Sequence, residues 1–158
     1  MSATFGFSES NGATPTVTDA ISNINFGSVD SPNLVTTTYP VVAGTNSFHK
    51  AIRAKFTGIG TSISNMLFWK SAGAYVTSET IVVKLQTSYL QPTQTALAGS
   101  SVIPTTSGTA LTVLNSSGGS SLTSDGYTEY ILLQLQTQSN TPAGAVNTKT
   151  FTFQYDEV

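Results

Sequence analysis

The strongest constraint on the fold is that the periodic segments of this sequence repeat every second residue. Side chains alternate between the two faces of a strand, so this pattern predicts strands with one buried and one exposed face. No window places apolar residues at i, i+3, i+4 and i+7, and strand-favouring residues dominate every periodic segment. Roughly seven to nine strands, separated by turns rich in Gly, Pro and Ser, predict an all-β sandwich or barrel.

The clearest predicted strands are residues 80–87, 129–136 and 147–155. Each places three large apolar side chains on one face, as Phe151, Phe153 and Tyr155 do in the last segment. Together with residues 46–70 they supply the predicted core: Ile52, Phe56, Leu67, Trp69, Val83, Leu85, Ile131, Leu133, Phe151 and Phe153.

Residues 46–70 contain the single Trp and the single His, and two strand-like runs flank a Gly-rich turn at 57–61. We interpret them as a β-hairpin at the centre of the fold. The first run has an apolar face and a polar face, and His49, Arg53 and Lys55 share the polar one. The second run has two largely apolar faces, with Leu67 and Trp69 on one and Met66 and Phe68 on the other.

A chain of 158 residues suits one domain. Immunoglobulin-like and jelly-roll topologies both fit the strand pattern, and long loops between strong strands favour a single jelly-roll-like β-sandwich over residues 19–158. Residues 1–18 carry few apolar groups and are predicted to form a flexible N-terminal arm, either frayed or paired with a neighbouring subunit. Phe5 and Phe7 would share one face of a strand added to a neighbour's sheet.

The charged fraction of 9% lies well below the roughly 25% typical of globular proteins. The formal net charge of −2 offers no long-range field for nucleic acid or an acidic membrane, so neither is predicted as a partner. A weakly charged surface protects poorly against self-association, which favours a homo-oligomer. The first ten residues lack a signal-peptide pattern and no apolar run is long enough for a membrane span, so we expect synthesis in a cytoplasm.

The sequence indicates no enzyme. There is one His and no Ser in a GxSxG setting, so a nucleophile–base–orienter triad is not expected. A pair of carboxylates of the glycosidase type is not excluded, although nearly all the acids lie in loops or near termini. With no Cys, no His cluster and no phosphate-binding loop, we predict no catalytic residue, no cofactor and no metal.

Three stretches resemble structural proteins of tailed bacteriophages. They are residues 26–34 (FGSVDSPNL), Pro40 followed by residues 43–50 (AGTNSFHK), and residues 63–69 (ISNMLFW). In those proteins an Asn-Ser-aromatic-x-Lys strand is followed by an Ile-x-Asn-x-x-Phe-Trp strand. The resemblance covers residues 24–90, marks framework positions and carries over no functional residue. It implies a small β-sandwich component of the virion, a class that includes head decoration proteins.

The resemblance implies a non-enzymatic capsid decoration protein, made in the host cytoplasm, that binds the outer surface of the head and stabilises the shell. Its partner would be the major capsid protein, and three-fold sites of capsid lattices imply a trimer. The alternatives are a tail or fibre component and a carbohydrate-binding module used for attachment. For that module the candidate sugar platform is Tyr39, Tyr75, Tyr89, Tyr127 and Trp69.

The residues expected to bind the partner are Phe5 and Phe7 on the arm and His49, Arg53 and Lys55 on the central strand. The three basic side chains would meet acidic groups on the shell or on a sister subunit. The competing interpretation is a solvated polar face that resists edge pairing. Exposed ion pairs contribute only ~0–1 kcal/mol each, so these residues are expected to guide docking more than to hold it.

Overall fold

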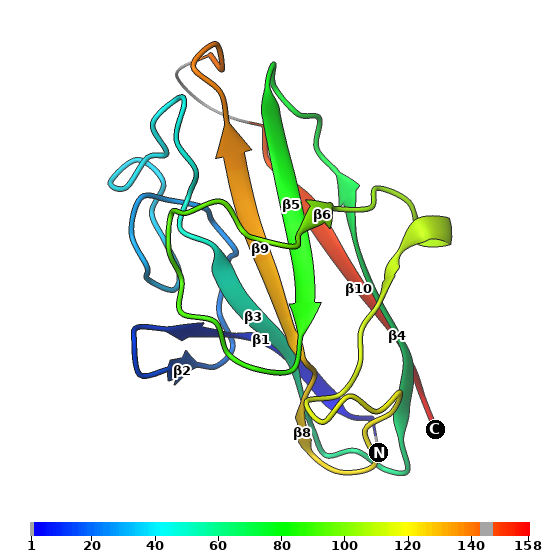
Figure 1. Ribbon diagram of the computed structural model, residues 1–158. Coiled ribbons are helices and arrows are strands. Elements are labelled where there is room, and N and C mark those ends of the chain that lie inside the picture. The colour runs from blue at the N-terminus through cyan, green and yellow to red at the C-terminus, as the bar shows by residue number, and fades with distance from the viewer. Residues whose placement is uncertain (1, 143–146) are drawn as a thin grey trace.

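The computed structural model describes residues 2–142 and 147–158 and shows two antiparallel sheets packed face to face (Figure 1). The larger sheet has the order β2-β1-β3-β9-β5-β6, with β8 also pairing to β3, and the smaller sheet has the order β10-β4-β7. The elements are β1 (Thr4–Asn11), β2 (Thr16–Thr18), β3 (Lys50–Thr57), β4 (Ile63–Ala72), β5 (Glu79–Gln86), β6 (Ser101–Val102), the 3-10 turn η1 (Ser107–Thr109), β7 (Leu111–Thr112), β8 (Gly126–Tyr127), β9 (Tyr130–Thr137) and β10 (Thr150–Glu157). The predicted all-β sandwich is confirmed.

The chain crosses repeatedly between the two sheets. Strands β3 and β9 of the larger sheet lead directly into β4 and β10 of the smaller one. The chain also crosses from β4 back to β5, from β6 to β7 and from β7 to β8. Connections that span the sandwich in this way are those of a jelly-roll-like fold.

The core lies between the sheets and follows the alternation of the long strands. Ile52, Ala54 and Phe56 of β3 and Ile131 and Leu133 of β9 are fully buried there. The smaller sheet contributes Met66 and Phe68 from β4, and the half-buried Phe151, Phe153 and Tyr155 of β10 pack against the same cluster. A fully buried apolar side chain of this size stabilises the fold by about 1.5–3 kcal/mol, so these strands hold the two sheets together.

Residues 46–70 do not form the predicted hairpin. β3 and β4 belong to different sheets and face each other across the core. The Gly-rich link between them is held from outside, because the backbone N–H of Ile59 donates to Asp125 Oδ1 at 3.1 Å. Both strands are nevertheless central, since each has a neighbour on either side in its own sheet.

The predicted core position Leu67 is wrong because the alternation of β4 is interrupted. Asn65 has a φ of 49°, and the pairing of β4 with β10 shifts register at this point. One extra residue turns the following side chains over, as a β-bulge does. Met66 and Phe68 therefore enter the core, while Leu67 is half-buried. Trp69 is buried, as predicted, but belongs to neither apolar cluster.

Residues 1–18 do not form the predicted flexible arm, because β1 is an integral strand. It pairs with β3 from Thr4 to Ser10. Its aromatic side chains enter the core: the ring of Phe5 stacks on Phe153 at 5.4 Å, and Phe7 meets Phe68 edge to face at 6.2 Å. The sequence concealed this, since the apolar surface that β1 covers comes largely from the opposite end of the chain.

A second apolar cluster lies on the outer face of the larger sheet. The link between β5 and β6 passes in front of β9 in Figure 1. It packs Leu97 and Tyr89 onto Ala51, Val82, Tyr130 and Leu132. The face predicted to be wet is therefore covered along part of its length.

Candidate functional site

The segment that joins β2 to β3 exposes apolar side chains to solvent. Residues 28–45 of this segment contain no strand and are called here the display loop. Val35, Tyr39 and Val42 of this loop are exposed by 58%, 41% and 64%, whereas Leu34 is buried. Three large apolar side chains at such exposure on one loop are typical of an interaction surface when they are contiguous.

The display loop is closed on itself by hydrogen bonds. The backbone N–H of Ser28 donates to the carbonyl of Tyr39 at 3.2 Å, and the N–H of Tyr39 donates to the carbonyl of Val35 at 3.2 Å. Gly27 sits beneath this closure, where a Cβ would lie 2.7 Å from the Tyr39 carbonyl oxygen and 2.8 Å from Leu34 Cδ1. Compact loops of this type, packed on their own side chains, are frequently functional.

Strand β9 anchors the C-terminal side of the loop. Thr137 Oγ1 donates to the carbonyl of Thr45 at 2.8 Å and accepts from the N–H of Gly44 at 3.1 Å. The N–H of Ser47 donates to the carbonyl of Leu135 at 2.9 Å. The loop lies beside the sandwich, in cyan and light blue in Figure 1, on the side where β1 and β2 turn.

The N-terminal side of the loop is anchored to a cluster of polar groups around the buried Glu9 and Lys50. It is called here the anchor cluster and consists of Glu9, Asn11, Asp30, Ser31 and Lys50. Lys50 Nζ donates to Glu9 Oε1 at 3.0 Å and to the carbonyl of Ser31 at 2.7 Å. Asp30 accepts from Asn11 Nδ2 and from the N–H of Gly12, at 2.5 Å and 2.7 Å. The cluster thus joins β1, β3 and the loop.

Burial dominates the electrostatics of the anchor cluster. It raises the pKa of Glu9, against the attraction of Lys50, and it lowers the pKa of Lys50, against the attraction of Glu9. Tyr89 closes the cluster from the β5–β6 link with a 2.6 Å hydrogen bond from its hydroxyl to the carbonyl of Gly12. Burial raises the pKa of Tyr89 to about 12, so this hydroxyl stays a donor at neutral pH.

His49 is not on a wet face, which corrects the sequence prediction. Only 2% of it is exposed, beneath the β5–β6 link. Its Nε2 lies 3.3 Å from the carbonyl of Leu90, and the N–H of Thr93 donates to its Nδ1 at 3.4 Å. Burial lowers the pKa of His49, so a neutral ring with the proton on Nε2 fits these contacts, and the side chain is closed to a partner.

Arg53 and Lys55 lie together on the outer face of the larger sheet, as predicted, but both already have partners. The guanidinium of Arg53 lies between the rings of Tyr127 and Tyr130, at 4.2 Å and 4.4 Å from their centroids. Lys55 forms an ion pair with Asp19, which also accepts a hydrogen bond from the hydroxyl of Tyr127. The two ring faces that Arg53 occupies are not open to a stacking sugar.

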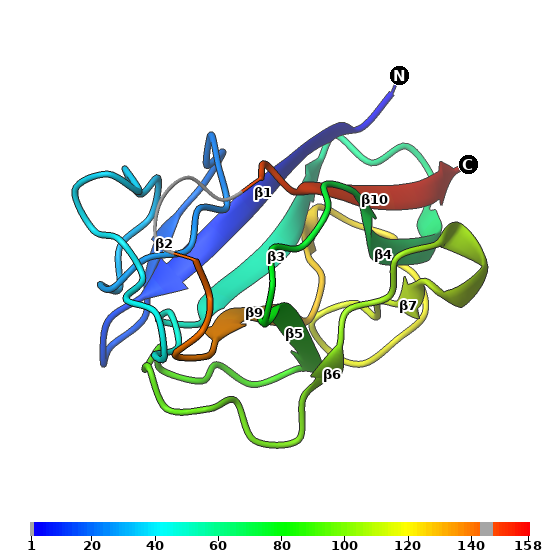
Figure 2. The ribbon, with the colours of Figure 1, turned by 90° about the horizontal axis from the view of Figure 1, so that it is seen from above.

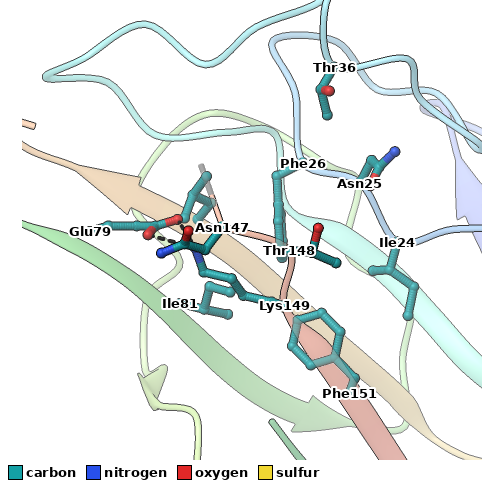
Figure 3. Close-up of a pocket in the computed structure, with 11 residues that line it drawn as sticks. Ile24, Asn25, Phe26, Thr36, Glu79, Ile81, Asn147, Thr148, Lys149 and Phe151 are labelled. Carbon is teal, nitrogen blue, oxygen red and sulfur yellow. Dashed lines mark hydrogen bonds and ion pairs between the residues drawn. The ribbon is translucent and has the colours of Figure 1, made fainter. Parts of the chain in front are cut away.

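A hollow lies between the segment at residues 24–26 and the segment that leads into β10 (Figure 3). Its volume is about 190 Å³, and a more open hollow of about 340 Å³ adjoins it. Glu79 and Lys149 lie at its wall, with Lys149 Nζ at 2.9 Å and 2.8 Å from the two carboxylate oxygens. Each charge is matched by the other, so the pair reads as a structural contact, and the smaller hollow lies below the roughly 300–1,000 Å³ of small-molecule sites.

Within residues 2–142 and 147–158, no group of three or more His, Asp or Glu side chains is placed to hold a metal ion. None of the helical structure in those residues is long and apolar enough to cross a membrane. Scans against protein-family models, curated proteins and solved structures each found no match to this chain.

Sequence reasoning missed both the display loop and its anchor. Residues 34–38 (LVTTT) have the composition of a short edge strand, but the loop there has no strand. One signal for the anchor was present: Lys50 has the same parity as Ile52 and Phe56, which places its side chain on the core face of β3. A charge at such a position is almost always paired, and here its partner is Glu9.

Proposed function

We propose that this chain is a non-enzymatic structural protein of a tailed-bacteriophage virion that docks on the outer surface of the head and stabilises the shell. Its partner is the major capsid protein, and the display loop makes the contact. The observation that carries the proposal is an ordered loop, tied down at both ends, that exposes Val35, Tyr39 and Val42.

Two physical arguments support the loop as the contact. A loop that is already ordered loses little conformational entropy on binding, so more of its apolar contact energy appears as affinity. A surface with few charges has few groups to desolvate, and only 9% of residues in this chain are charged. The resemblance of residues 24–90 to phage virion proteins supports the class of partner, and the display loop lies within that stretch.

Stabilisation follows from mass action. A protein that binds assembled subunits and not free ones shifts the equilibrium toward the assembled shell, by about 2.7 kcal/mol per site at a hundredfold excess over Kd. This stabilisation requires no catalytic activity. It requires only that the binding site on the head is complete when capsid subunits lie side by side.

The test uses phage heads assembled without this protein, purified chain and cryo-EM of the mixture. We expect density on the head lattice with the display loop against the capsid protein. Val35→Asp and Val42→Asp should each weaken binding by roughly tenfold or more, because a charge would be buried in the contact. Val102→Asp is the matched control, since Val102 on β6 is exposed by 60%, like Val35, and lies outside the loop; it should bind normally.

Other outcomes would replace the proposal. Binding to purified tails or fibres and not to heads would make the chain a tail or fibre component. Clear hits on a glycan array, lost on Tyr39→Ala, would make it a carbohydrate-binding module. Equal loss of head binding in all three Asp variants would show that the display loop is not the contact.

A further inference from the structure

Strand β10 leaves a long edge of the smaller sheet open. It pairs with β4 alone among the described strands and is eight residues long. Figure 2 shows β4 and β7 following it on one side only. An unpaired strand edge presents a row of backbone donors and acceptors, which is a template for another strand.

Ser2 and Ala3 contact Glu157 at the C-terminal end of this edge, but the rest of the edge lacks most of the usual protection against pairing. Natural edges are blunted by Lys, Pro, a bulge in the edge strand or a covering segment. Residues 150–155 of β10 contain no charged residue and no Pro. At both of its register shifts with β4 the extra residue lies in β4, so β10 itself is regular.

We propose that two copies of this chain pair edge to edge through β10, antiparallel, around a two-fold axis at Phe153. The two smaller sheets would then form one continuous sheet. A two-fold contact of this kind is self-complementary and closed, so it yields a dimer and not a filament. This proposal does not depend on the partner named under Proposed function.

The register follows from the alternation of β10, and the antiparallel direction follows from its two acidic residues. With Phe153 opposite Phe153, the aromatic residues Phe151 and Tyr155 face each other on the core side, and Thr152 faces Gln154 on the outer side. A parallel arrangement would instead place Asp156 beside Asp156 and Glu157 beside Glu157, which is unfavourable.

The absence of cysteine allows a clean test of this register. Thr152→Cys and Gln154→Cys variants are purified separately, mixed and oxidised. Directly opposite residues have Cβ atoms ~4.5–5.5 Å apart and diagonal ones are farther, so only the opposite pair comes within disulfide reach. We expect the mixture to give several-fold more cross-linked dimer than either variant alone, and Thr16→Cys, exposed on β2, to give none above background.

A second measurement does not depend on cross-linking. Sedimentation of the unmodified chain should show the 16.5 kDa species giving way to one of twice that mass as concentration rises. Thr152→Lys combined with Gln154→Lys places Lys opposite Lys and should restore the monomer with an unchanged circular dichroism spectrum, while Thr16→Lys should not. A monomer at millimolar concentration, a trimer as implied by the resemblance, or cross-linking equal to the Thr16→Cys control would each overturn the proposal.

Discussion

Lys50 and Glu9 form an ion pair that is closed off from solvent, with Nζ 3.0 Å from Oε1 and side-chain exposures of 2% and 0%. Removing two charges from water can cost more than their attraction returns, so such a pair need not stabilise the fold. Its second hydrogen bond, from Lys50 to the carbonyl of Ser31, holds the display loop in place. The pair is therefore best understood as a device for positioning the loop.

The first prediction concerns that pair. Lys50→Met should lower the free energy of unfolding by about 3–5 kcal/mol, because it leaves Glu9 buried without a counter-charge. Glu9→Leu combined with Lys50→Met should recover most of the loss. Urea unfolding of both single variants and the double variant would measure this, and a double variant no more stable than Lys50→Met would contradict it.

The pH dependence of Lys50→Met gives a further check on the same prediction. The pKa of Glu9 is already raised above 4.5 by burial, and removal of Lys50 raises it further. When the pKa of a carboxyl group is higher in the folded state than in the unfolded state, its contribution to stability is fully present at pH values below the unfolded pKa. The variant should therefore lose stability as pH rises from about 4.5 through the folded pKa of Glu9. If the free energy of unfolding of the variant did not change over that pH range, Glu9 would be exposed to solvent.

The second prediction concerns His49. Burial lowers its pKa below 6.5, so the folded state binds the proton less readily than the unfolded state does. The contribution of His49 to stability should be full above pH 6.5 and should fall as pH drops toward the folded pKa. Nitrogen chemical shifts in NMR should show a neutral ring at pH 6.5 with the proton on Nε2. A ring that titrates at its ordinary value would mean that it is exposed.

The third prediction concerns the N-terminal strand. Phe7→Ala should destabilise the fold by about 2–3 kcal/mol, somewhat below the cost of a fully buried Phe, because Phe7 is half-buried against Phe68 and Phe153. Removal of residues 1–10 should be worse, since it strips a strand from β3. Val17→Ala on the exposed β2 is the control and should change stability by less than about 0.5 kcal/mol. If the truncated chain kept its full stability, the N-terminal residues would be a flexible arm after all, as the sequence predicted.

Period-two alternation was sufficient to predict β5, β9 and β10 close to their observed bounds. Those strands are regular and their apolar faces are uninterrupted, so local pattern and tertiary position agree. In β4 the left-handed backbone at Asn65 reverses the faces. Asn tolerates this conformation better than most residues, but a single Asn in a strand-like run does not by itself predict a bulge. The pattern there predicted a strand correctly and its buried face incorrectly.

The remaining errors concern which segments meet. A turn between two strands permits either a hairpin or a crossing between sheets, and the sequence of residues 57–61 does not choose between them. The anchor cluster is likewise invisible locally, because Glu9 and Lys50 are joined only when β1 pairs with β3. Partner-binding residues predicted from exposure failed at His49 because the β5–β6 link covers it.

The pairing of the strands also sets the course of folding. β1 pairs with β3 across the display loop, β5 pairs with β9, and β4 pairs with β10 near the other end of the sequence. Such distant pairings require large loops to close, which costs conformational entropy before stabilising contacts form. The chain should therefore fold in milliseconds to seconds. During synthesis the smaller sheet has to wait for residues 150–157 to emerge, and until then Met66 and Phe68 of β4 lack their β10 cover. A nascent chain in that state exposes apolar surface, which makes it a substrate for chaperones.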